Sequence, residues 1–370
     1  MGGIYARPGA ARKTVTGEAG GSADRKIAMT GPVDTVLGQV MAGDLGQTLM
    51  HEHLLIDTRT AAHREASHLA VPLGLHNYYL SRRNDDHPHC LVLDSVSEAA
   101  DELRHFAAAG GRTLVEVTPV CLGRNPAGLA EISRATGIHV VMGAGFYEHE
   151  YHADAVHDRS AEQLAETIVR DCEEGVAGVS PARSVKAGVI GEIGLSWPAT
   201  DCEDRVLVAA ARAQAATGKL LIVHPGRDPA APRWALDRAE QAGADPARIA
   251  LAHLDRTLED PLQVARLAER GAYVSFDLFG AESSYYPYSG FAMPNDAGRL
   301  RLIRAVADLG HITRVLVSHD IYSKTHWLRY GGEGYAHILR DVVPVMDRFG
   351  IDTGMCRQIL VDNPARALGG

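Results

Sequence analysis

The segment Thr48-Leu-Met-His-Glu-His-Leu-Leu-Ile56 has the character of a short strand and carries two histidines two positions apart. In a β-strand, residues i and i+2 point to the same face, so His51 and His53 would point together. Imidazole is the commonest protein ligand of transition metals. The segment therefore predicts a strand whose two histidines could enter one space and share a metal ion.

Seven later segments have similar strand character, and longer segments of helical periodicity separate them. The predicted strands are 48–56, 113–119, 139–147, 188–196, 220–226, 249–255, 272–280 and 314–321. The predicted helices include 95–109, 160–174, 202–217, 261–270 and 296–309. Eight strands that alternate with helices are typical of a (β/α)8 TIM barrel, so we expect an α/β fold of this type.

The ends and one insertion depart from this alternation. Residues 1–30 are rich in glycine, alanine and basic residues and have no apolar period, so we expect a flexible leader. Residues 31–370 are then expected to form a single barrel domain. The stretch 57–94 is too long for a simple connection and is predicted to lie over the mouth of the barrel.

Composition limits the possible partners. The formal net charge is -9, so no excess of positive charge is present to neutralise nucleic-acid phosphates. No apolar run approaches the roughly 20 residues that cross a bilayer, and no signal peptide is visible. We therefore expect a cytoplasmic protein without nucleic-acid or membrane partners. The five cysteines form no C-x-x-C pair, so neither disulfides nor a thiolate zinc site is expected.

Further metal-binding residue types occur at the carboxyl ends of the later predicted strands. Glu192 interrupts a buried-looking strand, and His224, His253 and Asp320 each end one. Each residue alone could be a hydrogen-bonded core group. Because catalytic groups in barrels come from these strand ends, the joint pattern predicts a metal site there.

Six motifs occur in order along the chain: GQTLMHEH at 46–53, GVIGEIG at 188–194, AHLDR at 252–256, VSHD at 317–320, GGEGY at 331–335 and DNPA at 362–365. On these motifs, the chain from Thr35 to Gly370 resembles the phosphotriesterase-related family of the amidohydrolase superfamily. The resemblance implies a barrel with a binuclear centre of two divalent metal ions, most commonly zinc, with manganese or cobalt as alternatives. In this family a hydroxide and one acidic side chain bridge the two ions.

The resemblance also implies a role for each matching residue. The implied metal ligands are His51, His53, Glu192, His224, His253 and Asp320. Glu192 lies where many relatives have a carboxylated lysine, which places the chain in a glutamate-bridged branch. Asp320 is the implied catalytic residue, which accepts a proton from the hydroxide and passes it to the leaving group.

Substrate contacts are less clearly indicated. Arg256 could clamp a carboxylate or phosphate, or it could form a salt bridge with Asp255 or Glu259. Tyr147 is a second candidate contact. Six aromatic residues of predicted loops could line a pocket or pack in the core: Tyr147, Trp197, Phe279, Tyr285, Tyr286 and Trp327. The sequence DLFG at 277–280 replaces the DRYG expected in relatives that hydrolyse acyl-homoserine lactones, which counts against that specificity.

The leading functional prediction is hydrolysis of a lactone or related carboxylic ester by a metal-bridging hydroxide. An alternative keeps the same centre but cleaves the amide of an N-acyl amino acid or N-acyl taurine-like compound, or a phosphoester or phosphotriester. A remote alternative is a catalytically silent barrel that binds a small ligand. A small-molecule substrate is expected in each case, and the family resemblance makes a homodimer possible.

Overall fold

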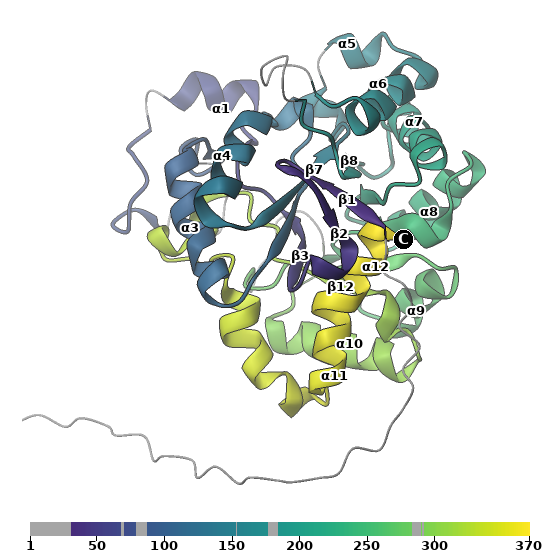
Figure 1. The fold of residues 1–370 in the computed structure, drawn as a ribbon. Coiled ribbons are helices and arrows are strands. Elements are labelled where there is room, and N and C mark those ends of the chain that lie inside the picture. Colours follow the sequence, from purple (N-terminus) through teal and green to yellow (C-terminus); the bar gives the residue numbers. More distant parts are fainter. Residues whose placement is uncertain are drawn as a thin grey trace, which may run out of the picture.

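The computed structural model describes residues 31–67, 70–78, 87–152, 154–176, 184–282, 290 and 292–370. Its central sheet has eight parallel strands in the order β12-β11-β10-β9-β8-β7-β6-β3. These strands are β3 (Thr48–Glu52), β6 (Thr113–Glu116), β7 (His139–Ala144), β8 (Val189–Gly194), β9 (Leu221–His224), β10 (Ile249–Leu251), β11 (Tyr273–Phe276) and β12 (Val315–Val317). The predicted (β/α)8 barrel is confirmed (Figure 1).

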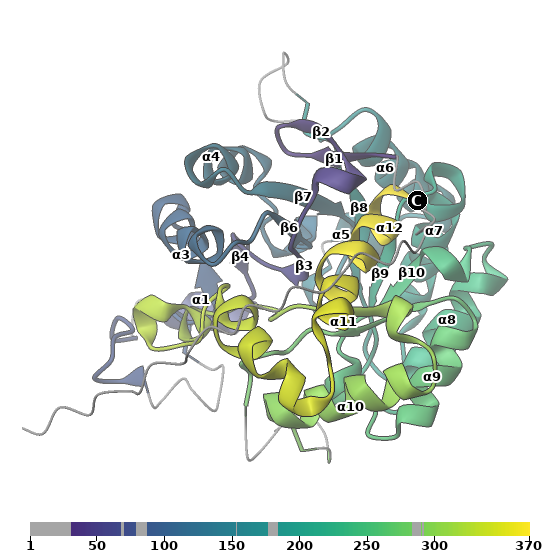
Figure 2. The same cartoon turned by 60° about the horizontal axis from the view of Figure 1, so that its bottom comes forward.

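Helices surround the sheet and connect successive strands (Figures 1 and 2). The longer ones are α3 (Val96–Ala108), α4 (Pro126–Thr136), α6 (Ala161–Glu173), α7 (Asp201–Thr217), α8 (Ala231–Gln241), α9 (Pro261–Glu269) and α10 (Asp296–Asp308). Side-chain caps fix several starting points; for example, the Thr200 hydroxyl accepts a hydrogen bond from the backbone N–H of Glu203. All five helices predicted above are present within two residues of their predicted bounds.

Shorter elements complete the fold. The short strands and helices are β1 (Pro32–Thr35), β2 (Gly38–Met41), β4 (Ile56–Asp57), β5 (Val92–Leu93), α1 (Ala61–Ala66), α5 (Asp154–His157), α11 (Thr353–Arg357) and α12 (Asn363–Gly369). The remaining helical turns are η1 (Ala42–Asp44), η3 (Val120–Leu122), η4 (His149–Tyr151), η5 (Pro246–Arg248), η6 (Leu254–Arg256), η7 (Ile312–Arg314), η8 (Lys324–His326), η9 (Leu328–Tyr330), η10 (Ile338–Val342), η11 (Val343–Phe349) and η12 (Gln358–Asp362).

Two details differ from the sequence expectations. Every barrel strand is shorter than predicted, because the polar residues after each strand already belong to the loops that surround the site. The antiparallel pairs β1–β2 and β4–β5 were not predicted. The proposed leader, residues 1–30, lies outside the described residues.

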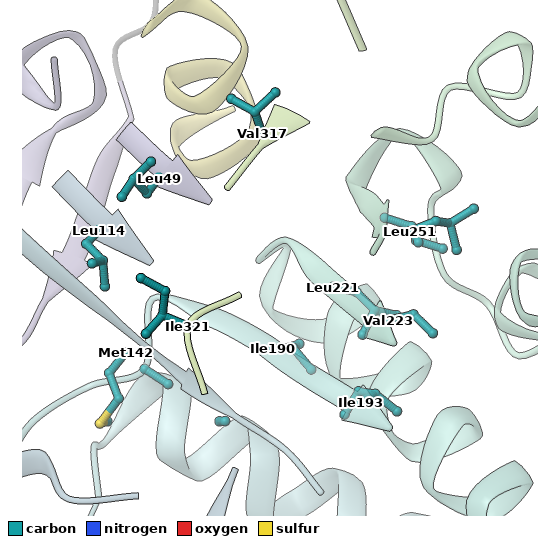
Figure 3. Close-up of a cluster of buried hydrophobic side chains, with 14 of the residues drawn as sticks. Leu49, Leu114, Met142, Ile190, Ile193, Leu221, Val223, Leu251, Val317 and Ile321 are labelled. Carbon is teal, nitrogen blue, oxygen red and sulfur yellow. The ribbon is translucent and has the colours of Figure 1, made fainter. Parts of the chain in front are cut away.

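The apolar side chains of the strands form two layers. One cluster contains Leu49, Met142 and Val223 together with side chains of the surrounding helices, so these residues face outward from the barrel (Figure 3). The other cluster contains Met50 and Ile222 with residues of β1, η1 and α12, which close the amino-terminal end. Successive strand residues alternate between the layers, as the two-residue period of a strand requires. The interior at the opposite end is left for polar side chains.

Irregularities in two strands redirect the side chains that follow them. The pairing of β3 with β6 shifts between Leu49 and Glu52, and the pairing of β8 with β9 shifts between Ile190 and Ile193. A bulge adds one residue to a strand and therefore reverses the alternation beyond it. Both bulges lie at the polar end of the barrel, next to the predicted metal ligands.

The barrel closes between its last and first strands through a buried carboxylate. The backbone N–H of Asp320 donates to the carbonyl of His51 at 3.2 Å. The Glu52 carboxylate accepts hydrogen bonds from the Ser318 hydroxyl, from the backbone N–H groups of His319 and Ile321, and from the His319 ring. Glu52, the central residue of the His-Glu-His motif, therefore has a structural role in this closure.

A partly buried ion-pair network attaches η10 and the segment before it to α10. The His337 ring lies 2.6 Å from Asp296 Oδ2 and 3.0 Å from Asp341 Oδ2. Burial lowers the pKa of His337, but these carboxylates outweigh burial and raise it above its ordinary value of 6.5. The stabilisation from a raised histidine pKa is complete below pH 6.5 and is lost as the pH rises through the folded-state pKa.

We expect His337→Asn to lower the free energy of unfolding by about 1 kcal/mol at about pH 6, because hydrogen bonds to charged partners are lost at a partly exposed site. At about pH 9 the variant and the wild type should be closer in stability, since the wild-type ring loses its proton as the pH rises through its raised folded-state pKa. Urea unfolding at both values measures the difference. His105→Asn, at an exposed position of α3, is the control. An effect of His337→Asn that is equal at both values would contradict the assigned role of the charge.

Candidate metal centre and cavity

The structure brings all six predicted ligands together at the carboxyl ends of the strands. His53 Nε2 lies 3.3 Å from Glu192 Oε1 and 3.3 Å from Asp320 Oδ1. His224 Nδ1 lies 2.9 Å from Glu192 Oε2 and 3.0 Å from His253 Nε2. His51 Nε2 lies 3.5 Å from Glu192 Oε2. Glu192 is therefore at the centre of the cluster and contacts histidines on both of its sides.

The cluster meets the chemical requirements of a metal site. His51 is 1% exposed, and neither of its ring nitrogens has a hydrogen-bond partner among the described residues. A buried imidazole without partners is costly unless another group satisfies it. Two sets of three ligand atoms share this space, namely His51 with His53 and Asp320, and Glu192 with His224 and His253. Imidazole and carboxylate ligands suit zinc and similar divalent ions.

Outer hydrogen bonds orient the histidines of the cluster. His53 Nδ1 lies 2.8 Å from the Thr118 hydroxyl, which donates to Glu116 at 2.6 Å. His253 is held through Asp277 Oδ1, which lies 2.8 Å from both its backbone nitrogen and its Nδ1. Such contacts fix the tautomer and the ring orientation of metal-binding histidines.

Asp277 was missed as a member of the site by the sequence reasoning. It is fully buried, and its second oxygen lies 3.4 Å from His51 Nδ1. The signal was available, because Asp277 follows a predicted strand in the same way that Asp320 does. Before the structure was known, Asp277 was considered only as the first residue of the DLFG sequence at 277–280.

Electrostatics within the cluster favour bound cations. Burial alone lowers the pKa of His53, but Asp320 and Glu192 raise it to about 10. Burial likewise lowers the pKa of His253, but Asp277 and Asp320 raise it to about 10, despite the opposing effect of Arg256. Protons therefore occupy His53 and His253 when no metal is bound, and metal binding would displace them.

A cavity of about 420 Å³ opens beside the cluster. Its walls include Tyr147, Glu148, Arg227 and Arg256, with His53, Glu192, His224 and Asp320 among the remaining lining residues. The described part of the 57–94 insertion also lines it, through Thr58, Thr60, His63 and Leu91. The predicted position of this insertion at the mouth therefore agrees with its described residues. A cavity of this size accommodates a small molecule.

Arg256 lies in the wall of the cavity and not in the predicted salt bridges. Its side chain is almost fully buried, with Nη2 2.9 Å from His224 Nε2, and its Nη1 has no hydrogen-bond partner among the described residues. Asp255 forms its ion pair with Arg299 instead, at 2.6 Å. Arg256 is therefore a buried cation with a donor group available beside the cluster.

Tyr147, the second candidate contact, also lines the cavity, and its hydroxyl lies 3.4 Å from His224 Nδ1. The other described aromatic candidates do not line the cavity. Phe279 and Trp327 are buried core residues, and Trp197 packs against Trp234. Tyr285 and Tyr286 lie outside the described residues. Glu148 and Tyr322 line the cavity and were missed, since nothing in their local sequence marks them.

Comparison with known proteins fits this geometry. The phosphotriesterase family model matches residues 31–368 of the chain. The chain belongs to the phosphotriesterase family. The six motifs of the sequence therefore identified the family correctly, and the chain is a metal-dependent hydrolase of this family. Among the described residues, no helix is sufficiently long and apolar to span a membrane.

Individual relatives cover nearly the whole chain. The chain is 39% identical over 347 residues to N-acetyltaurine hydrolase of Bos taurus, an alignment that covers 92% of this chain and 98% of the relative. The resiniferatoxin-binding protein of Rhodobacter sphaeroides has a similar structure, with a TM-score of 0.84 and 36% identity over 91% of this chain and 95% of that one. The phosphotriesterase homology protein of Escherichia coli, solved with phosphate in its active site, has a TM-score of 0.72 and 28% identity, with 87% and 98% of the two chains covered.

Proposed function

We propose that this chain hydrolyses the amide bond of a small N-acyl compound that carries an anionic group, with N-acetyltaurine as the leading candidate. The observation that carries the proposal is the buried, incompletely paired guanidinium of Arg256 in the cavity wall beside the metal-ligand cluster. The N-acetyltaurine hydrolase relative supports an amide, the alternative in the sequence prediction, over the lactone that the sequence reasoning preferred.

We propose two divalent metal ions, with zinc as the ion that the donor set favours, held by the predicted residues. The ligands are His51, His53, Glu192, His224, His253 and Asp320. When bound, the two ions would lower the pKa of a shared water and polarise the carbonyl under attack. Glu192 contacts residues of both ligand sets, which suits the role of a bridge.

Arg256 would bind the anionic end of the substrate. A sulfonate or carboxylate offers oxygen acceptors to the planar guanidinium, and Nη1 already lacks a partner. If His224 binds metal through Nδ1, its Nε2 carries a proton that Glu148 Oε1 can accept, 3.4 Å away. Arg256 Nη2 would then lose His224 Nε2 as an acceptor and keep its 3.5 Å contact with the Pro225 carbonyl, which leaves one N–H available to the substrate. The phosphate bound in the Escherichia coli homologue supports an oxyanion in this type of site.

Asp320 would transfer the proton that amide cleavage requires. His253 and His53 lower the pKa of Asp320 even though burial raises it, so Asp320 is ionised at neutral pH and can accept a proton from the attacking water. Once protonated, it can pass this proton to the amide nitrogen as the C–N bond breaks. An amine is a poor leaving group without this proton, so Asp320 has a larger task here than with an activated ester.

A substrate panel tests the proposed function. Metal-loaded enzyme is assayed with N-acetyltaurine, N-acetyl amino acids, a neutral N-acetyl amide of similar size, a lactone panel and a phosphotriester. We expect N-acetyltaurine to give the highest kcat/KM. A higher kcat/KM for a lactone would overturn the amide proposal while leaving the metal centre intact.

Arg256→Met should lower kcat/KM for N-acetyltaurine by about 10²-fold, because a charged hydrogen-bonding partner is lost in a buried site. The neutral amide should lose much less, since it makes no ion pair with this residue. Steady-state kinetics with both substrates separates the two effects. Arg212→Met, on the exposed face of α7, serves as the matched control. Equal losses for the anionic and neutral amides would remove Arg256 from substrate recognition.

Two finer predictions from the sequence remain predictions. They are the homodimer and the cytoplasmic location. The single domain over residues 31–370 also stays a proposal, supported by the match of the family model to residues 31–368.

A further inference from the structure

A second cluster of metal-binding residue types lies outside the cavity, where the segment after β7 meets the start of α7. His149, His152, His157 and Cys202 each offer one ligand atom, and these four atoms all lie within 4.8 Å of one another. His149 begins η4, His157 ends α5 and Cys202 lies in the first turn of α7. None of the four is among the residues that line the cavity.

The cluster is compact enough for its four ligand atoms to reach one ion. The ring centroids of His149 and His157 are 4.8 Å apart, and those of His152 and His157 are 5.8 Å apart. Cys202 Sγ lies 3.3 Å from His152 Nδ1. In a zinc site, nitrogen and sulfur ligands lie about 2.0–2.3 Å from the ion and therefore about 3.5 Å from one another. Side-chain rotations that move the ligand atoms by about 1 Å would bring the four atoms to these distances.

The hydrogen bonds around the cluster already prepare a ligand tautomer. His152 Nε2 lies 2.6 Å from the carbonyl oxygen of Tyr147, so Nε2 carries the proton and donates it. The lone pair of Nδ1 is then directed toward Cys202. A ring that donates its other N–H to a backbone carbonyl is the usual arrangement of a metal-binding histidine.

Backbone contacts hold the two sides of the cluster together. The backbone N–H of His149 donates to the buried carboxylate of Glu203 at 2.9 Å. The Arg205 guanidinium donates to the carbonyl of His157 at 3.0 Å. The acceptor Glu203 and the donor Arg205 both belong to α7, close to Cys202 in the sequence. The backbone that carries the ligands is therefore positioned by contacts that need no metal.

We propose that His149, His152, His157 and Cys202 bind a third divalent metal ion of borderline softness, with zinc as the expected ion. Three imidazoles and one thiolate suit zinc or cobalt and not magnesium or calcium. Four protein ligands leave no open position, so the site is structural. Its ion would tie the segment after β7 to α7 and so fix Tyr147 and Glu148, which line the cavity.

No pattern in the sequence predicts this site. Cys202 belongs to no C-x-x-C pair, and that absence led us to expect no thiolate zinc site. The fold instead places a single cysteine against three histidines that lie about 50 residues earlier in the chain. The inference does not depend on the proposed amide hydrolysis, because its tests count metal ions and detect a thiolate ligand.

Cobalt substitution tests the proposal directly. The full chain is loaded with Co²⁺, and unbound ion is removed before elemental analysis and absorption spectroscopy. We expect three equivalents of cobalt and a near-ultraviolet sulfur-to-cobalt charge-transfer band. The proposed binuclear centre contains no cysteine and cannot produce this band. Two equivalents without the band would overturn the proposal and leave the binuclear centre unaffected.

Variants assign the band to Cys202. Cys202→Ser should abolish the band and reduce cobalt from three equivalents to two, whereas Cys356→Ser, remote from the cluster, should retain both. If Cys202→Ser does not fold, His157→Gln replaces it, since His157 is only half-buried. His157→Gln should also bind one equivalent fewer. A band that persists in Cys202→Ser, or three equivalents retained in His157→Gln, would overturn the assignment.

Discussion

Asp320→Asn should reduce turnover of the N-acyl substrate by about 10³-fold or more while the protein retains its fold and most of its metal. The substitution preserves the shape of the side chain and one oxygen ligand but removes the group that accepts and returns the proton. General acid–base groups contribute about 10²- to 10⁴-fold, and the demand is greatest when the leaving group is an amine. Steady-state kcat on protein of measured metal content gives the result.

A comparison of leaving groups separates proton transfer from metal binding in this variant. A p-nitrophenyl ester has a leaving group that needs no proton, so Asp320→Asn should impair its hydrolysis much less than that of the amide. Asp308→Asn, at an exposed position on α10, controls for a general change of charge. Near-normal amide turnover by metal-replete Asp320→Asn would exclude Asp320 from the mechanism. Equal losses for amide and ester would restrict Asp320 to holding metal.

The identity of the proposed ligands could be predicted because barrel strands deliver polar residues at a known end. His224, the last residue of β9, keeps the ordinary alternation of its strand, since Ile222 faces the interior two residues earlier. Asp320 lies three residues beyond β12 and has a left-handed backbone with φ of 53°, so its residue type and position near a strand end, and not alternation, identify it. A histidine or aspartate after a run of buried apolar residues is conspicuous in the sequence. The rule for strand ends then places such residues together.

The direction of other ligands could not be predicted from alternation. Leu49 faces outward, so a regular β3 would also turn His51 and His53 outward. The bulge between Leu49 and Glu52 reverses this direction. His253 follows an inward Ala252 and adopts a left-handed backbone with φ of 56°. A bulge and a positive φ depend on tertiary contacts, and neither leaves a pattern in an apolar run that is buried on both faces.

Arg256 illustrates a different limit of the sequence. Its neighbours Asp255 and Glu259 made a local ion pair plausible, and no sequence feature favoured a position in the cavity wall over that ion pair. In the structure, Asp255 forms its ion pair with Arg299 of α10 and not with Arg256. Arg299 is 43 positions from Arg256 along the chain. Long-range competition for one carboxylate thus determines whether Arg256 is available to a ligand.

Glu192→Ala should reduce the metal held at the binuclear centre from about two equivalents to fewer than one and abolish hydrolysis, while the separate ion proposed at His149, His152, His157 and Cys202 is retained. Among the described residues, Glu192 is the one carboxylate that contacts His53, His224 and His51 within 3.5 Å, so its removal takes away negative charge from both ligand sets. Two cations held side by side without the negative charge of a bridging carboxylate would repel each other with little compensation. Elemental analysis after dialysis against metal-free buffer measures the loss.

Thermal unfolding provides the second measurement for Glu192→Ala. Metal at about 1,000 times its Kd stabilises a folded protein by about 4 kcal/mol, so chelation should lower the Tm of the wild type clearly. The Tm of Glu192→Ala should fall much less on chelation than that of the wild type, because little metal is bound at its binuclear centre and chelation removes the separately proposed ion from both proteins. Glu192→Gln, which keeps the side-chain volume, controls for the cavity that alanine leaves. If Glu192→Ala keeps two tightly held ions at the centre, then the bridge between them is formed by another residue.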